Sequence, residues 1–265
     1  MKKISFVILT WNSDKYITNC IESIDTICNF CTQITIVDNG STDNTIKILK
    51  EYEKNNNIHV VFLPTNEGTT KSRNIALKQI REDTDYICIL DSDTIINSEA
   101  IDILAKYLDK HEEVAIVGPS MKNEKGEKQI PYRKFPNWRI KLLKAFPIKK
   151  ISKKGQKLES YPIEEVTDEF ECDYLISACW LMRYETYKKL GNLDEKIFYS
   201  PEDVEYCMRA RSCGYKIVHL RKAEIIHIYQ RISKKKLISK INLSHLLGIK
   251  YILKKYKKFL RKYKR

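Results

Sequence analysis

Short apolar runs and amphipathic stretches alternate along the first 120 residues of the chain. The runs have the length and composition of strands, and the stretches between them repeat apolar residues every three or four positions. Strand–helix repeats of this length are typical of a doubly wound α/β fold with a mostly parallel sheet. The predicted strands cover residues 4–9, 33–37, 59–63, 86–90 and 114–117, and the predicted helices cover residues 15–27, 44–54, 69–80 and 98–111, the last capped by Ser98.

Polar clusters follow the first four of these strands. The carboxyl ends of parallel strands meet at one edge of a sheet, and ligands bind beyond that edge. We therefore expect the clusters to form a single site. They are residues 10–12, 38–43, 66–68 and 91–93.

The last cluster contains two carboxylates, Asp91 and Asp93, directly after a buried strand. Paired carboxylate oxygens suit Mg²⁺ or Mn²⁺, and these ions also ligate the phosphates of a nucleotide. Acidic turns after strands also occur as simple caps of the next helix, so the pair alone does not decide between the two.

The other clusters favour a nucleotide. Asp38 can accept from a base N–H or a ribose hydroxyl, and residues 40–43 form a tight turn into a helix. Lys71 and Arg73 lie in the opening turns of the next helix, where a cation can meet a diphosphate. For Arg73 the alternative is a surface ion pair. The chain has neither a Walker loop nor a G-x-G-x-x-G fingerprint, which excludes P-loop enzymes and the usual dinucleotide dehydrogenases.

The remainder of the chain divides into an irregular and a regular part. Residues 121–170 show no periodicity and are interpreted as a variable insert or lid. Periodic order returns at residues 174–182, followed by predicted helices near 185–190 and 203–213 and a predicted strand at 216–220.

The positive charge is concentrated at the end of the chain. There are 48 Lys and Arg against 34 Asp and Glu, and residues 231–265 hold fourteen basic residues and no acidic one. Apolar residues recur there every three or four positions, which predicts a basic amphipathic helix suited to an anionic membrane surface. The alternatives are docking on its own domain or on a second subunit, as in a homodimer. A charge confined to the tail does not favour nucleic-acid binding by the fold.

Cysteine usage and hydropathy indicate a cytoplasmic protein. No apolar run reaches the roughly 20 residues of a membrane-spanning helix, and the apolar start lacks a signal-peptide cleavage site. The eight cysteines are therefore expected to be reduced and mostly buried. Cys28 and Cys31 form a lone C-x-x-C without a second pair at zinc-site spacing.

Several segments, taken together, resemble the family 2 glycosyltransferases of GT-A fold, in the branch of bacterial rhamnosyltransferases and related polysaccharide enzymes. The resemblance extends over about residues 3–230 and includes His227. The segments are ISFVILTWNS (4–13), IVDNGSTDNT (36–45), NEGTTKSRN (66–74), YICILDSD (86–93), ISACWLMR (176–183), LGNLD (190–194) and PEDVEYCMRARSCG (201–214).

The resemblance implies an inverting, metal-dependent transfer of a sugar from a nucleoside diphosphate to a glycan or lipid-linked glycan. Residues 1–230 would form the GT-A domain, with a nucleotide-sugar half (1–120), the insert (121–170) and an acceptor and catalytic half (171–230). The basic tail, 231–265, suggests a peripheral location on the inner face of the plasma membrane.

The resemblance also implies residue roles. Asp203 is the expected general base beside Glu202, and Asp91, Asp93 and His227 would hold Mn²⁺ or Mg²⁺. The expected donor site comprises Thr10, Asn12, Asp38, Asn66, Gly68, Lys71, Arg73, Asp91 and Ser92. The acceptor-side candidates are Trp180 and Tyr199.

Two other function classes are considered. A nucleotidyltransferase shares the sheet and the metal chemistry, but would want a Gly-rich, Arg-containing loop where residues 10–13 stand. A non-catalytic module binding polyanions or nucleic acid would bind through residues 231–265 alone. The donor base stays open between UDP and dTDP, because uracil and thymine both present an N3–H to Asp38.

Overall fold

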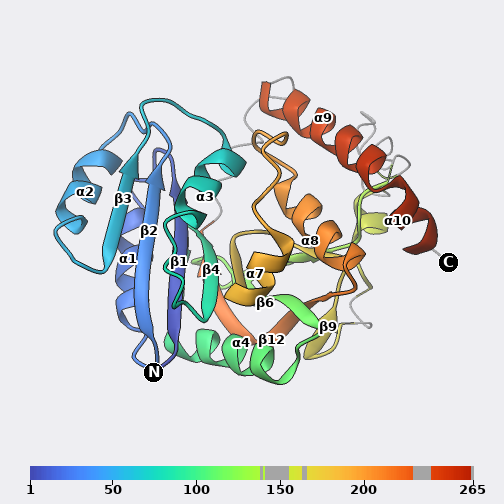
Figure 1. The fold of residues 1–265 in the computed structure, drawn as a ribbon, viewed down its shortest axis with the longest axis horizontal. Coiled ribbons are helices and arrows are strands. Elements are labelled where there is room, and N and C mark those ends of the chain that lie inside the picture. Colours follow the sequence, from blue (N-terminus) through green and yellow to red (C-terminus); the bar gives the residue numbers. More distant parts are fainter. Residues whose placement is uncertain (138–139, 141–154, 163–165, 229–239, 264–265) are drawn as a thin grey trace.

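A central mixed sheet organises the chain in this computed structural model, which describes residues 1–137, 140, 155–162, 166–228 and 240–263 (Figure 1). The order of its main strands is β3-β2-β1-β4-β11-β6-β12-β5. Their bounds are β1 (Lys3–Thr10), β2 (Cys31–Asp38), β3 (Ile58–Phe62), β4 (Tyr86–Asp91), β5 (Thr94–Ile95), β6 (Val114–Lys122), β11 (Cys179–Arg183) and β12 (Lys216–His227).

The predicted parallel half is confirmed. Strands β3, β2, β1 and β4 are parallel neighbours, and Thr10 is in register with Asp38 at their carboxyl ends. The sheet then differs from a simple parallel order, because β11 lies antiparallel between β4 and β6. The side chains of β11 alternate between the two faces of the sheet, and both faces are covered: Cys179 and Leu181 belong to one core, Trp180 and Met182 to the other.

Helices cover both faces of the sheet, as in a doubly wound fold. On β1, Ile4, Phe6 and Ile8 belong to the core beneath α1, α2 and α4, whereas Val7 belongs to the core beneath α3, α7 and α8. The bounds are α1 (Ile17–Asp25), α2 (Thr45–Tyr52), α3 (Thr69–Leu77), α4 (Ser98–Lys110), α7 (Tyr184–Leu190), α8 (Glu202–Ser212), α9 (Lys240–Lys255) and α10 (Lys257–Tyr263).

The cap of α4 differs from the prediction. Asn97, not Ser98, is the capping residue: its backbone is extended and its side-chain oxygen accepts from the Ala100 N–H at 2.8 Å. Ser98 is already the first helical residue.

The insert contains more strand than its sequence indicates. β6 continues to Lys122, and two short strands follow within the insert, β7 (Lys128–Gln129) and β8 (Tyr132–Arg133); β9 (Glu169–Glu171) crosses its end, and β10 (Tyr174–Leu175) comes after it. β7 pairs with β6, β9 pairs with β12, and β8 pairs with β10. Residues 138–139, 141–154 and 163–165 of the insert lie outside the described residues.

All eight cysteines are free thiols, and five of them are buried. The prediction of reduced, mostly buried cysteines is confirmed. Cys28 and Cys31 are both exposed and unbridged.

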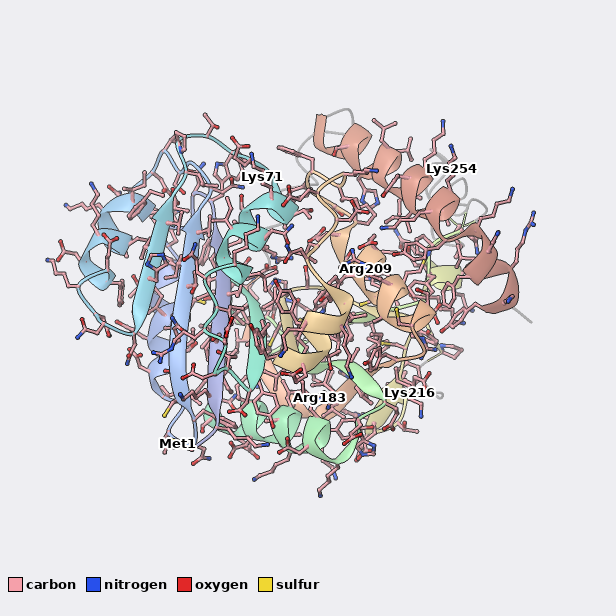
Figure 2. All side chains as sticks on the ribbon, viewed as in Figure 1. Met1, Lys71, Arg183, Arg209, Lys216 and Lys254 are labelled. Atoms are coloured by element: carbon pink, nitrogen blue, oxygen red, sulfur yellow. The ribbon has the colours of Figure 1, made fainter. Side chains whose placement is uncertain are left out.

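The basic tail docks on its own domain. Tyr256 donates to Glu205 of α8 at 2.7 Å, and the Lys255 ammonium lies 2.8 Å from the same carboxylate. Lys254, on the outer side of α9, points away from the domain (Figure 2). Among the described side chains of α9, the buried apolar residues are Ile249, Ile252 and Leu253, and Tyr256, directly after the helix, is buried as well. This part of the apolar stripe is therefore covered by protein and does not face a membrane, which corrects the sequence-based preference; residues 231–239 lie outside the described part of the chain.

Gly248 sets how closely α9 approaches the residues before α8. A Cβ at this position would lie 2.7 Å from Pro201 Cδ and 3.0 Å from the Ser200 carbonyl oxygen. We expect Gly248→Ala to destabilise the protein by up to about 2 kcal/mol in urea unfolding, because an overpacking cost of about 1–3 kcal/mol outweighs the roughly 1 kcal/mol by which alanine favours a helix.

The sign of the change in the free energy of unfolding tests this prediction. A rise of about 1 kcal/mol would mean that helix propensity alone acts and that the approach is not tight. Leu247→Ala, at a neighbouring position that is 57% exposed, is the matched control and should change stability by less than about 0.5 kcal/mol.

Candidate active site

Three metal-ligand side chains converge at the carboxyl edge of the sheet. Asp91 ends β4, Asp93 follows two residues later, and His227 ends β12, so that one ligand atom of each lies within 4.8 Å of the others. His227 Nε2 is 3.5 Å from Asp93 Oδ1. Two hard carboxylates and one imidazole fit a divalent ion that accepts both donor types, such as Mn²⁺.

Arg73 connects this cluster to the acidic pair. It is 2% exposed, and its guanidinium lies 2.6 Å from Asp91 Oδ1 and 3.0 Å from Glu202 Oε1. The same guanidinium donates to the Ser177 hydroxyl at 2.8 Å. Of the sequence-based alternatives for Arg73, the surface ion pair is wrong because Arg73 is buried in both ion pairs, and the diphosphate contact stays a prediction.

The two acids at the start of α8 lie in different environments. Glu202 is 7% exposed, and its Oε1 accepts from both Arg73 and Ser177. Burial and the neighbouring Asp203 raise the pKa of Glu202 to about 8, although Arg73 opposes the shift. Asp203 is only half-buried and accepts from the Val204 N–H at 2.7 Å. Because a general base must reach its substrate, this asymmetry favours Asp203 over Glu202.

The raised pKa of Glu202 makes folding stability depend on pH. Between pH 4.5 and about 8 the folded carboxyl keeps a proton that the unfolded chain has released, so this contribution is full below pH 4.5 and is lost as the pH rises through 8. We expect Glu202→Gln to flatten the fall in free energy of unfolding from pH 5 to pH 8.5. Chemical unfolding at four pH values measures this fall. An equal dependence of the free energy of unfolding on pH in the variant and the wild type would contradict the raised pKa of Glu202.

The donor-side residues at the ends of β1 and β2 are buried. Asp38 accepts from the Ser41 N–H at 3.0 Å and from the Ser41 hydroxyl at 2.5 Å, and burial raises its pKa. Thr10 is fully buried, and its hydroxyl has no hydrogen-bond partner among the described residues. Asn12 has a positive φ of 51° and accepts from the Thr42 N–H, which fixes the loop after β1.

The loop before α3 is held by its own side chains. Asn66 accepts from the Gly68 N–H at 3.0 Å. Gly68 has a φ of 84°, and a Cβ there would lie 2.2 Å from the Phe198 carbonyl oxygen, so glycine permits the close approach of this loop to Phe198. Lys71 is half exposed and pairs with Glu67 at 2.7 Å (Figure 2). The structure thus gives Lys71 a surface partner rather than a place in the Arg73 bridge.

The last three predicted residues fall in different places. Ser92 is buried, with its hydroxyl 2.9 Å from that of Ser13. Trp180 is fully buried and stacked on Tyr206 at 6.1 Å, so its proposed contact with a sugar is wrong: in this structure it is a core residue. Tyr199 is half-buried, three residues before Glu202–Asp203 in the sequence.

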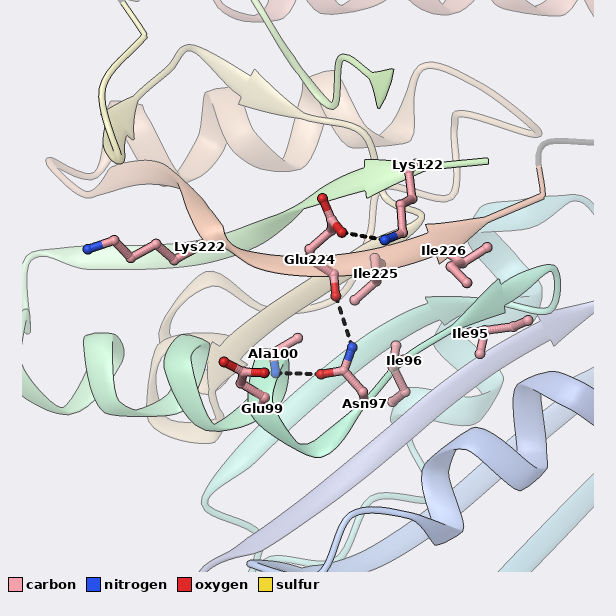
Figure 3. Close-up of a pocket in the computed structure, with 10 residues that line it drawn as sticks. All are labelled: Ile95, Ile96, Asn97, Glu99, Ala100, Lys122, Lys222, Glu224, Ile225 and Ile226. Carbon is pink, nitrogen blue, oxygen red and sulfur yellow. Dashed lines mark hydrogen bonds and ion pairs between the residues drawn. The ribbon is translucent and has the colours of Figure 1, made fainter. Parts of the chain in front are cut away.

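A pocket of about 340 Å³ lies between β5, β12 and the start of α4 (Figure 3). None of the predicted site residues lines it. Its polar groups bind one another: Lys122 pairs with Glu224, and Asn97 donates to the Glu224 carbonyl at 3.0 Å. We do not assign it to the chemistry.

Two further residues of the site were not predicted. Ser177 shares the Arg73–Glu202 contact, and Gln129 of β7 hydrogen-bonds His227. Ser177 stands inside a quoted motif without a distinguishing pattern, and Gln129 stands in the insert, where the sequence carries no signal for it.

Known proteins match parts of this chain. A poly(ribitol-phosphate) β-N-acetylglucosaminyltransferase, TarS of Staphylococcus aureus, is 36% identical over 114 residues, which is 42% of this chain and 20% of TarS. The dTDP-rhamnosyl transferase RfbF of Shigella flexneri is 26% identical over 195 residues, 73% of this chain and 59% of RfbF. The chain thus spans less than two thirds of the length of either relative.

Solved structures share the fold. S. aureus TarS 1–349 in complex with UDP-GlcNAc superposes with a TM-score of 0.58 at 24% identity, covering 90% of this chain and 62% of that one. GalNAc-T7 with UDP, GalNAc and Mn²⁺ gives 0.71 at 14% identity, covering 95% and 48%. These neighbours have the GT-A fold, which confirms the predicted fold class.

The sequence itself matches one family over most of its length. Residues 5–191, from β1 to the end of α7, fit the family described as glycosyl transferase family 2. The match includes the Asp91 and Asp93 segment and the Arg73 helix, and it favours neither of the two other function classes. The chain therefore belongs to glycosyl transferase family 2.

Proposed function

We propose that this protein is an inverting, metal-dependent glycosyltransferase that uses a UDP- or dTDP-sugar in the assembly of a cell-surface polysaccharide. The observation that carries the proposal is the buried Arg73 bridge, because it joins the metal-ligand cluster to the acidic pair. The cluster that would stabilise the leaving group and the acidic pair that would take the proton then lie on two sides of one site.

Each part of the proposed reaction is assigned to different residues. The acceptor hydroxyl oxygen attacks the anomeric carbon while the bond from that carbon to the diphosphate breaks, and Asp203 takes the hydroxyl proton. A bound divalent ion would neutralise the charge that develops on the departing diphosphate. Asp91, Asp93 and His227 are the residues that would hold it. A single displacement inverts the anomeric configuration.

The donor end is formed by Thr10 and Asp38, which are adjacent in register. Each Asp38 oxygen that accepts from Ser41 keeps a second lone pair, and a base N3–H can donate to it. The unpaired Thr10 hydroxyl is a second buried group that a ligand could satisfy. The names of the relatives support both donors, since TarS was solved with UDP and UDP-GlcNAc and RfbF is a dTDP-rhamnosyl transferase.

The acceptor is proposed to be a glycan or a lipid-linked glycan, with Tyr199 on the acceptor side. The names of TarS and RfbF support polymer glycosylation. Within the described residues, no helix combines the length and the apolarity needed to cross a membrane. Contact with the inner membrane face would therefore use exposed lysines such as Lys254 and Lys258 rather than the buried stripe.

Thermal unfolding with UDP, dTDP, GDP and CDP, each with and without Mn²⁺, tests the proposal. A ligand at a hundred times its Kd adds about 2.7 kcal/mol of stability, which is a clear shift. We expect a shift with UDP or dTDP that grows with Mn²⁺ and is lost in Asp93→Asn. The absence of a shift with all four nucleotides would contradict the proposal. A shift that is the same with and without Mn²⁺, and the same in Asp93→Asn as in the wild type, would also contradict it.

A further inference from the structure

His227 is held at two points by one side chain from the insert. Its ring Nδ1 lies 2.7 Å from Gln129 Oε1, and Gln129 Nε2 donates to the His227 carbonyl oxygen at 2.6 Å. Gln129 belongs to β7, which pairs with β6 through Met121. The amide therefore reaches the end of β12 from a different strand and contacts both the ring and the backbone of His227.

These two contacts define where the imidazole hydrogen lies. A backbone carbonyl can only accept, so the NH₂ of Gln129 must face it and Oε1 must face the ring. Oε1 can also only accept, so Nδ1 must carry the hydrogen. In the neutral ring Nε2 is then the nitrogen with the lone pair.

That nitrogen is the one on the metal side. Nε2 is 3.5 Å from Asp93 Oδ1, and a ring nitrogen of His227 lies within 4.8 Å of ligand atoms of Asp91 and Asp93. His227 is 4% exposed, so the ring has little freedom to turn. Metal-ligating histidines commonly donate their second ring N–H to a carbonyl or carboxylate, and this contact fixes the tautomer and the ring orientation.

We propose that Gln129 is a positioning residue that presets His227 as an Nε2 ligand for the divalent ion. The inference rests on the metal site of the proposed function, but its first consequence concerns the metal-free protein. Without Gln129 the buried ring can exchange tautomers, and the third ligand is no longer prearranged.

Nitrogen-15 NMR of the histidine side chains, recorded without metal over a pH series that extends to the neutral ring, tests the tautomer directly. We expect His227 to show a protonated Nδ1 and an unprotonated Nε2, with His227→Gln used to assign the signals. Gln129→Met, which removes the amide at similar volume, should give a mixture of tautomers. A protonated Nε2 in the wild type, or an unchanged spectrum in Gln129→Met, would overturn the proposal.

Mn²⁺ titration with UDP or dTDP, followed by electron paramagnetic resonance, tests the consequence for the ion. Gln129→Met is expected to weaken Mn²⁺ binding by about 10- to 100-fold, and Ile130→Met, next in sequence and 44% exposed, should leave it unchanged. Nucleotide binding without metal should be equal in all three proteins.

His227→Gln separates the two ideas. If it leaves Mn²⁺ binding unchanged, the ligand set of the proposed function is wrong. If it weakens binding while Gln129→Met does not, the ligand set stands and the role of Gln129 is wrong.

Discussion

Replacing Asp93 by asparagine should lower the rate of sugar transfer by at least about 1,000-fold without unfolding the protein. The amide keeps the shape of the side chain but removes one of the two negative ligands beside His227. A bound ion supplies several kcal/mol of charge stabilisation to the leaving diphosphate, and about 4 kcal/mol corresponds to this factor. The measurement is kcat/KM with the nucleotide sugar that stabilises the wild type.

Asp25→Asn is the matched control, since Asp25 is exposed at the end of α1. It should transfer sugar at the wild-type rate. If Asp93→Asn kept more than a tenth of the activity with an unchanged Mn²⁺ requirement, Asp93 would not be a ligand of the ion.

The second large effect is expected at Arg73. Arg73→Met removes the only cation described between Asp91 and Glu202, and breaking a buried ion pair typically costs about 3–5 kcal/mol of folding stability. Asp91 keeps 35% of its side chain exposed and can be solvated, so most of the cost falls on Glu202. Glu202 loses its buried, unpaired charge when it binds a proton, and proton binding is favoured at lower pH. The loss of unfolding free energy measured in urea should therefore be larger at pH 8.5 than at pH 5.5.

Two further variants are compared with Arg73→Met. Arg81→Met also removes an arginine, but its side chain is 67% exposed and it should change stability by less than about 0.5 kcal/mol. Arg73→Lys should recover only part of the loss, because a single ammonium cannot contact Asp91, Glu202 and Ser177 in the geometry of the guanidinium. Equal stabilities of Arg73→Met and Arg81→Met would contradict a stabilising role of the bridge.

Local rules explain which parts of the fold and site were predictable. The strands around Phe6 and Ile89 are apolar runs of strand length, and the acidic turn after Leu90 must lie at the ligand edge if the sheet is parallel. The convergence of Asp93 with His227 could be expected only from the family resemblance, because 134 residues separate them in the chain.

Long-range packing decided what could not be predicted. An arginine near the start of a helix indicates a ligand for an anion, and no local pattern tells that α8 will bring Glu202 against Arg73. A tryptophan in an apolar run is as compatible with a sugar-binding surface as with a core. Only the position of β11 between β4 and β6, in the interior of the sheet, identifies Trp180 as a core residue. In the same way, the periodicity of α9 defines an apolar stripe but not the surface that covers it.

The docking of α9 against Ser200 and Pro201 has a consequence for the order of events during synthesis. Domains form from the N-terminus as the chain emerges at about 5–20 residues per second. The segment that carries Asp203 therefore waits for its packing partner until residues 240–263 have been made, roughly 3 to 12 s after Glu202 at that rate. During this interval strands β1 to β4 can already pair, so the proposed donor site can form before the proposed general base is held in place.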